Sequence, residues 1–234
     1  MIFGKIDFLN LLPFHVFMKR YAKTLKVHQS LNYHKGVPST LNRAFAARRI
    51  DAAFISSITA RQCKHFNIGI VAKREVLSVL SIPSDSHKDD TQSATSNLLS
   101  QILDIHGEVL IGDKALRYYY SGREHTDLGK IWNERTGLPF VFALLCTHHH
   151  TNELKRLSHA FIRKPIKIPY YILMENAKKS DLTPAQITHY LQYISYKIGE
   201  KEERGYKRFV REAKRRGLNP SLRDIRYEKQ KLQK

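Results

Sequence analysis

The chain has 234 residues, a hydrophobic content of 42% and a formal net charge of +19. This length and apolar content suffice for one large domain or for two lobes with separate cores. The longest apolar run, LPFVFALLC at 138–146, has about nine residues, whereas a transmembrane helix needs roughly 20. The composition therefore predicts a globular protein that does not span a membrane.

The amino terminus and the cysteines indicate the compartment. MIFGKIDF at 1–8 lacks the basic segment, apolar stretch and cleavage site of an export signal, so we expect a cytoplasmic protein. Cys63 and Cys146 are far apart and match no metal-binding spacing. We therefore expect two reduced thiols and no disulfide.

The positive charge would suit a nucleic-acid partner, because lysine and arginine bind phosphates by releasing counterions. Much of the excess, however, lies at 202–217 and 226–234, on the polar face of an expected helix and in a tail. We interpret these runs as solvated surface and expect no nucleic-acid partner. A positive field also attracts small anionic substrates.

Strand and helix patterns alternate up to residue 81, which is typical of parallel βα units. The polar stretch 83–92 predicts a loop, and a second βα series follows it. The expected strands are 2–8, 26–33, 51–55, 67–82 with a break near Lys73, 108–112 and 138–146; the expected helices are 12–22, 37–49, 93–105 with Thr95 or Ser96 as N-cap, 113–120 with Asp113 as N-cap, and 127–137.

The last third of the chain reads as helical. Thr183 is an N-cap, Gln186 completes a capping box, and an apolar stripe continues to Gly199. We predict an α/β fold of two lobes with a ligand cleft between them. Lobe 1 would be residues 1–81 completed by helices in 183–234, and lobe 2 would be residues 82–182. Ligands in such folds bind at strand carboxyl ends and helix amino ends.

Small hydroxyl-bearing side chains recur where the expected strands end and helices begin. Backbone N–H groups and hydroxyls at such places can hold a carboxylate or phosphate, although serine and threonine also cap helices routinely. Asn10 is the single amide in the mainly apolar run KIDFLNLLPF, where it either caps the next helix or faces a polar ligand. The candidate binding residues are Ser56, Ser57, Ser78, Ser81, Thr95 and Ser96.

The run His148–His150 suggests a metal site, but consecutive side chains on a strand point to opposite faces. No aspartate lies nearby to orient the imidazoles, so we expect no metal site. Walker A, GxGxxG and GxSxG motifs are absent, so neither a nucleotide cofactor nor acyl transfer is indicated.

Six blocks together resemble the chorismate dehydratases of the futalosine route to menaquinone; in chain order they are KIDFLNLLPF, GVPSTLNRAFAARRIDAAFISS, IGIVAKREVLSVLS, SATSNLL, LIGDKALR and DLGKIWNERTGLPFVFA. The resemblance implies a fold like the type II periplasmic binding proteins, used as a cytoplasmic enzyme. It also implies a carbon–oxygen lyase that removes water from chorismate to give 3-[(1-carboxyvinyl)oxy]benzoate without a cofactor.

The resemblance places Asn10 in the active site and makes Ser56 and Ser57, with Thr95 and Ser96, carboxylate cradles on the two lobes. Ser78 and Ser81 are further candidates at the crossover between lobes. No carboxylate or histidine stands out as the base. The hypothesis is therefore that the enolpyruvyl carboxylate of the substrate accepts the proton, held by Asn10.

Two departures from the family pattern concern the pocket wall. Phe8 stands where many relatives carry tyrosine, and Leu144–Leu145 where many carry tryptophan. Three alternatives stay open: the sister enzyme that forms 1,4-dihydroxy-6-naphthoate, a non-catalytic protein that binds small anions, and a nucleic-acid-binding protein.

Overall fold

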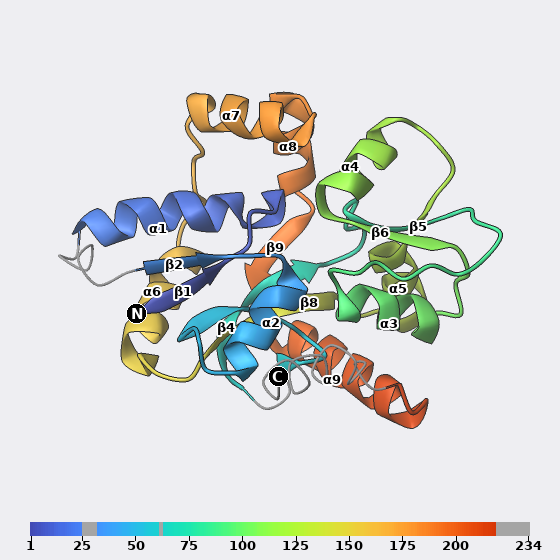
Figure 1. Ribbon diagram of the computed structural model, residues 1–234, viewed down its shortest axis with the longest axis horizontal. Coiled ribbons are helices and arrows are strands. Elements are labelled where there is room, and N and C mark those ends of the chain that lie inside the picture. Colours follow the sequence, from blue (N-terminus) through green and yellow to red (C-terminus); the bar gives the residue numbers. More distant parts are fainter. Residues whose placement is uncertain (25–31, 61–62, 219–234) are drawn as a thin grey trace, which may run out of the picture.

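The computed structural model describes residues 1–24, 32–60 and 63–218, which form two β-sheets with helices packed around them (Figure 1). The large sheet has the strand order β2-β1-β3-β8-β4-β9, and the small sheet has the order β6-β5-β7. The strands of the large sheet are β1 (Ile2–Lys5), β2 (Asn32–Lys35), β3 (Ala52–Ser56), β4 (Lys64–Ala72), β8 (Phe140–Thr147) and β9 (Ile194–Lys197). Those of the small sheet are β5 (Val79–Ile82), β6 (Glu108–Ile111) and β7 (Thr126–Asp127).

Strand direction brings the ends of β1 and β3 together. β1 runs parallel to both β2 and β3, as the alternation of strand and helix patterns predicts. The carboxyl ends of these strands therefore lie at one edge of the large sheet. Asn10 lies after β1, Ser56 is the last residue of β3 and Ser57 follows it, so the fold brings these residues to the same edge of the sheet. β8 and β4 run antiparallel to their neighbours.

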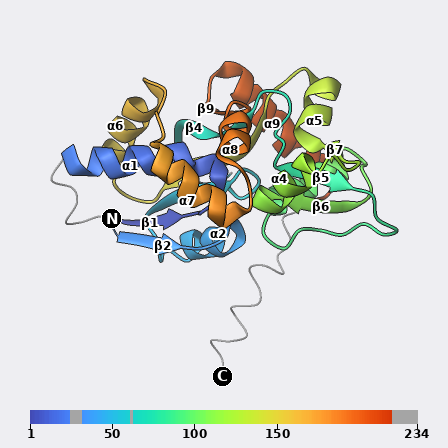
Figure 2. The same ribbon diagram turned by 90° about the horizontal axis from the view of Figure 1, so that it is seen from above.

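The helices surround both sheets. α3 to α5 lie around the small sheet at one end of the molecule (Figure 1), and α1 and α6 lie beside the large sheet at the other end (Figure 2). A single 3₁₀ turn, η1 (Leu9–Leu11), leads into α1. The helices are α1 (Leu12–Thr24), α2 (Pro38–Ala46), α3 (Ala94–Ile102), α4 (Gly112–Tyr120), α5 (Leu128–Thr136), α6 (Thr151–Ile162), α7 (Tyr170–Ser180), α8 (Pro184–Leu191) and α9 (Glu200–Arg215). None of the helices in these described ranges is long and apolar enough to cross a membrane.

A buried aspartate fixes the first crossing between the sheets. The carboxylate of Asp127 accepts hydrogen bonds from the backbone N–H groups of Val76 at 3.0 Å and Leu77 at 2.8 Å, just before β5. The same carboxylate caps α5 by accepting from the N–H of Lys130 at 3.0 Å. Burial raises the pKa of Asp127, and these backbone hydrogen bonds oppose the rise.

Side chains of α4 tie the small-sheet end to the helices α7 and α8. The guanidinium of Arg117 donates to the carbonyl of Ser180 at 2.8 Å, and the hydroxyl of Tyr120 donates to the carbonyl of Gln186 at 2.9 Å. These contacts span more than 60 residues of sequence, so they belong to the tertiary fold and not to a local turn.

An aromatic cluster joins α5, β8 and α9. The ring of Phe140 packs edge-to-face against Trp132 at 5.2 Å and against Phe209 at 4.9 Å between centroids. All three side chains are buried. Gly205 of α9 lies directly on the carbonyl of Pro139, which precedes β8; an added Cβ would be 2.1 Å from that oxygen. The absence of a side chain at Gly205 therefore lets α9 reach the sheet.

The sheets do not divide where the sequence analysis placed the lobe boundary. β4 and β5 lie in different sheets, so the break expected near Lys73 is confirmed. β5, expected in lobe 1, belongs to the small sheet, whereas β8, expected in lobe 2, is a central strand of the large sheet. The apolar pattern of β8 predicted burial correctly but carried no information on which sheet it would join.

The last third is less helical than predicted. α8 has the expected N-cap at Thr183 and the capping box with Gln186, but it ends at Leu191. The following ISYK segment is β9, which pairs antiparallel with β4. Pairing with an open sheet edge overrides the helical stripe there. The expected strand at 26–33 is found only in part, since residues 26–31 lie outside the described ranges.

The prediction of free thiols was wrong. Cys63 and Cys146 form a disulfide with a Cα–Cα distance of 5.8 Å. The reason is topological: β4 and β8 are antiparallel, and His65 lies opposite Cys146, so Cys63 meets its partner across the strands despite a separation of 83 residues. The distance falls within the range of about 4.4–6.8 Å that disulfides use.

Candidate functional site

A cavity at the junction of the two sheets gathers four of the seven predicted site residues. Asn10, Ser56, Ser78 and Ser96 line it, together with apolar side chains from both sheets. Its volume is about 60 Å³. The complete lining is Ile6, Phe8, Asn10, Pro38, Phe54, Ser56, Ile70, Val76, Ser78, Val79, Ser93, Ser96, Ile111, Gly112, Phe142 and Ala143.

Asn10 lies inside η1, in the middle of the turn that connects β1 to α1. Its side-chain oxygen Oδ1 is buried and has no hydrogen-bond partner in the described part of the chain. The amide therefore does not cap α1, which was the alternative interpretation. The hydroxyl of Tyr196 donates to the backbone carbonyl of Asn10 at 2.6 Å and so positions the turn from β9. An unpartnered buried acceptor is costly unless a ligand satisfies it.

Ser56 is oriented by an asparagine that sequence reasoning missed. The amide nitrogen of Asn42 donates to the hydroxyl of Ser56 at 2.8 Å, and the amide oxygen accepts from the backbone N–H of Ser56 at 3.1 Å. Because the hydroxyl of Ser56 already accepts a hydrogen bond, its own proton is available for a ligand. Asn42 sits on α2, and nothing in its local sequence distinguishes it from a solvent-facing residue.

The amino terminus of α3 forms the opposite wall. Ser93, and not Thr95 or Ser96, is the N-cap: its hydroxyl accepts from the backbone N–H of Ser96 at 3.2 Å. The hydroxyls of Ser93 and Ser96 lie 2.9 Å apart, and both side chains line the cavity. The positive end of the helix dipole and these hydroxyls together suit an anionic group.

Ser57 and Thr95 contact each other instead of the cavity. Their side-chain oxygens lie 3.4 Å apart, and Thr95 also accepts from the backbone N–H of Ile58 at 3.3 Å. Both residues are buried and absent from the cavity lining. They therefore join the end of β3 to α3 across the junction.

Ser78 and Ser81 lie on different sides of their segment. The buried hydroxyl of Ser78 lines the cavity and accepts from the hydroxyl of Tyr190 at 2.9 Å. Burial raises the pKa of Tyr190 strongly, so this phenol stays protonated and acts as a donor. Ser81 instead donates to the carbonyl of His106 at 3.4 Å, away from the cavity. Ser78 lies in the bend before β5, whereas Ser81 lies within β5, so the two side chains have different surroundings.

The histidine run has a structural contact. The ring of His148 stacks on Phe45 with centroids 3.9 Å apart, and its Nε2 lies 2.7 Å from the carbonyl of Phe45. Within the ranges that the structure describes, no group of three or more His, Cys, Asp or Glu side chains is placed to hold a metal ion.

A second pocket of about 270 Å³ adjoins the cavity, and Phe8 lines both. Lysines and carboxylates surround it, together with His15 of α1. Asp113, expected as an N-cap, instead lies in the first turn of α4, and its carboxylate accepts a hydrogen bond from the backbone N–H of Leu9. Burial raises the pKa of Asp113, and this hydrogen bond and Arg117 oppose the rise.

Burial lowers the pKa of His15 from 6.5 to about 4, and the charges of Lys5 and Lys19 act in the same direction. The unfolded chain therefore binds more protons than the folded protein between these values, and the free energy of unfolding should fall as the pH drops from about 6.5 to about 4. The loss should not exceed about 3 kcal/mol. Urea unfolding at several pH values tests this. His15→Leu should flatten the slope, whereas exposed His159→Leu should not; parallel profiles for all three proteins would contradict it.

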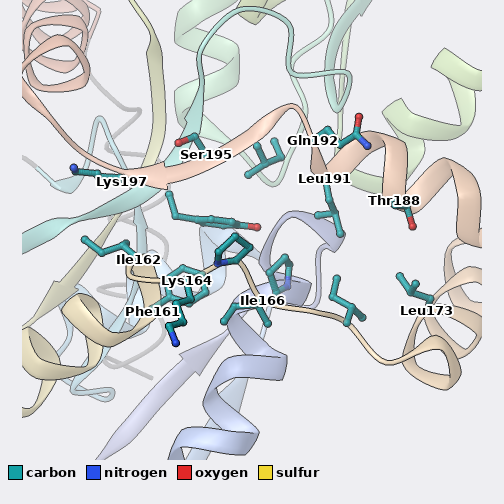
Figure 3. A pocket seen from close by; sticks show the side chains of 15 residues that line it. Phe161, Ile162, Lys164, Ile166, Leu173, Thr188, Leu191, Gln192, Ser195 and Lys197 are labelled. Carbon is teal, nitrogen blue, oxygen red and sulfur yellow. The ribbon is translucent and has the colours of Figure 1, made fainter.

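A larger hollow lies elsewhere. It is a mainly apolar groove of about 530 Å³ between the end of α6, the segment that follows it, α8 and β9 (Figure 3). None of the predicted site residues lines this groove. The smaller cavity has the convergent hydroxyl and amide groups that a specific site needs, so it is the candidate site.

The sequence matches a family model described as menaquinone biosynthesis over residues 1–107 and 104–215. A chorismate dehydratase from Campylobacter jejuni subsp. jejuni serotype O:23/36 (strain 81-176) is 44% identical over 218 residues, which are 92% of this chain and 98% of that protein. A chorismate dehydratase from Thermus thermophilus is 22% identical and covers 85% of this chain and 94% of its own length.

Solved structures confirm the expected fold class. The protein AF1704 from Archaeoglobus fulgidus has a TM-score of 0.64 at 16% identity and covers 93% of this chain and 97% of its own. The periplasmic aliphatic sulphonate binding protein SsuA from Escherichia coli has a TM-score of 0.57 at 14% identity and covers 97% and 96%. The chain thus has the two-lobed fold of the periplasmic binding proteins.

Proposed function

We propose that this chain, which belongs to the menaquinone biosynthesis family, is a hydro-lyase that converts chorismate to 3-[(1-carboxyvinyl)oxy]benzoate. The observation that carries the proposal is the chemistry of the cavity. Its lining combines several serine hydroxyls and an amide oxygen that is buried with no partner in the part of the chain that the structure describes, and it contains no titratable side chain. Such a site suits a reaction in which the substrate supplies its own charged groups.

The reaction depends more on the orientation of the substrate than on reactive side chains of the protein. A C–H bond at the ether-bearing ring carbon and the C–O bond of the adjacent hydroxyl break, and the proton and hydroxide leave as water. The new double bond completes an aromatic ring, which makes the step favourable. The protein has to position the dianion, exclude water and stabilise the charge that spreads onto the ring carboxylate.

Asn10 and the serines divide these tasks in the proposal. The enolpyruvyl carboxylate of chorismate accepts the proton, because none of the described residues lining the cavity can act as a base. The amide of Asn10 holds this carboxylate or the departing hydroxyl, since it offers either a donor or an acceptor. Ser56 on one side, and Ser93 and Ser96 at the start of α3 on the other, bind carboxylate oxygens.

The volume of the cavity bears on how the substrate binds. About 60 Å³ is far below the roughly 300–1,000 Å³ of typical ligand pockets. Chorismate therefore requires the two sheets to move apart at their junction and to close on it again. The Ser57–Thr95 contact, which spans this junction, would break on opening.

A direct assay tests the proposal. Purified protein should consume chorismate in the presence of a chelator and produce one equivalent of the aromatic product, separated by chromatography. Heat-inactivated protein is the control for spontaneous decay of chorismate. If chorismate survives but binds, as measured by calorimetry, the chain is a binding protein; if it neither reacts nor binds, the proposal fails.

A further inference from the structure

The pocket beside the cavity contains more lysines than its carboxylates neutralise. Lys5, Lys19, Lys35 and Lys179 line it, opposite Asp7, Asp113 and Glu175. It lies where the carboxyl ends of β1 and β2 meet α1, α4 and α7.

Two of the three carboxylates are paired with lysines. Asp7 pairs with Lys5 at 2.8 Å, and Glu175 pairs with Lys179 at 2.5 Å. Asp113 accepts the backbone N–H of Leu9, and its Oδ1 is buried with no hydrogen-bond partner among the described residues. Two of the four lysines are thus taken by neighbouring acids.

Lys19 and Lys35 are the two lysines of the pocket that, in the described part of the chain, are not paired with an acid. Both side chains are exposed, and within the described residues neither forms an ion pair. They lie on α1 and at the end of β2, on the rim of the same hollow. The pocket, with a volume of about 270 Å³, has more room than the cavity behind it. An anion that reaches it meets these two exposed lysines at little cost in desolvation, in a lining that holds four lysines against three carboxylates. Lys35 also acts on Asp7 and Lys19 on Glu175 through their charges.

Phe8 is the wall between this pocket and the cavity, since its ring lines both. The ring lies against Gly112 at the start of α4: a Cβ added at Gly112 would be 3.2 Å from the Phe8 ring. Phe8 belongs to the large-sheet side and Gly112 to the small-sheet side, so separation of the sheets would open this wall.

We propose that the pocket beside the cavity is the entrance of the site. There, Lys19 and Lys35 capture a small dicarboxylate anion before it passes Phe8 into the cavity. This inference rests on the proposed function for the identity of the substrate. Capture by exposed charges accelerates association and weakens with salt, and such steering changes association rates by about 10–10³-fold.

The kinetic test compares two pairs of lysines with the same change in net charge. Lys19→Glu with Lys35→Glu should lower kcat/KM for chorismate about tenfold or more at low salt, and more than it lowers kcat. It should also flatten the decline of kcat/KM with added sodium chloride. The control is Lys164→Glu with Lys197→Glu, two exposed lysines on the large apolar groove. Equal losses in both double variants would show a general field effect and overturn the proposal.

A binding test separates this inference from the proposed function. Isophthalate is a stable aromatic dianion, and its titration into ¹⁵N-labelled protein should shift the amide signals of residues around Lys19 and Lys35. These shifts should vanish in the Lys19→Glu, Lys35→Glu variant and persist in the control. Shifts without chorismate turnover would reject the function but keep the anion site. If chorismate is converted but isophthalate shifts no amide signals and the Lys19→Glu, Lys35→Glu variant has normal kinetics, the proposed entrance is rejected and the proposed function stands.

Discussion

Replacing Asn10 with leucine should lower kcat for chorismate by about 10²–10³-fold, the usual effect of removing one hydrogen-bonding group that acts on developing charge. Leucine has a similar size and keeps the wall of the cavity filled. It removes the only amide in the lining, whose oxygen is buried without a partner among the described residues. Steady-state kinetics with product detection by chromatography measure the effect.

Two comparisons make the Asn10 result specific. Asn10→Asp keeps the shape but places a negative charge beside the carboxylate of the substrate, so KM should rise as well as kcat fall. Exposed Asn152→Leu on α6 serves as the control and should keep wild-type kinetics. Full turnover by Asn10→Leu, with an unchanged melting temperature, would refute the role of Asn10 and leave the family assignment intact.

Replacing Gly205 with alanine should lower the free energy of unfolding by about 3 kcal/mol, the upper end of the usual cost of overpacking. The added Cβ would be 2.1 Å from the carbonyl oxygen of Pro139, and neither backbone can yield without separating α9 from β8. The direction is diagnostic, because the same change at an open helix position stabilises by about 1 kcal/mol. Urea unfolding followed by circular dichroism measures the loss.

Arg204→Ala is the matched control for Gly205, since it introduces alanine at the neighbouring, exposed position of α9. Its free energy of unfolding should stay within about 0.5 kcal/mol of the wild-type value. A Gly205→Ala protein as stable as the wild type would mean that α9 does not approach β8 as closely as described.

The sequence identified the residues whose role depends on local context. Asn10 stood out because an amide in an apolar run has few structural uses, and the structure places it in the cavity. The capping box of Thr183 and Gln186 was also a local signal and is confirmed, whereas the N-caps expected at Thr95 or Ser96 and at Asp113 were wrong. Ser56, Ser78 and Ser96 line the cavity, and each lies at or next to the end of a strand or helix: Ser56 ends β3, Ser78 precedes β5 and Ser96 lies in the first turn of α3.

Most of the other predictions that went wrong depended on which segments meet in the fold. The sequence pattern could not separate Ser78 from Ser81, or assign Ser57 and Thr95 to each other, because those outcomes depend on side-chain direction at a junction. Asn42, Tyr190 and Tyr196 support the site from distant parts of the chain and carry no local signal.

Apolar periodicity, turn residues and isolated polar groups act over a few residues, so the sequence alone determined the α/β class, most of the elements and the amide at position 10. Sheet membership was decided only in three dimensions. Antiparallel pairing placed β8 in the large sheet, converted the end of an expected helix into β9 and brought Cys63 to Cys146. Strand pairing joins residues far apart in the chain, and its free energy depends on a partner edge that no local pattern encodes.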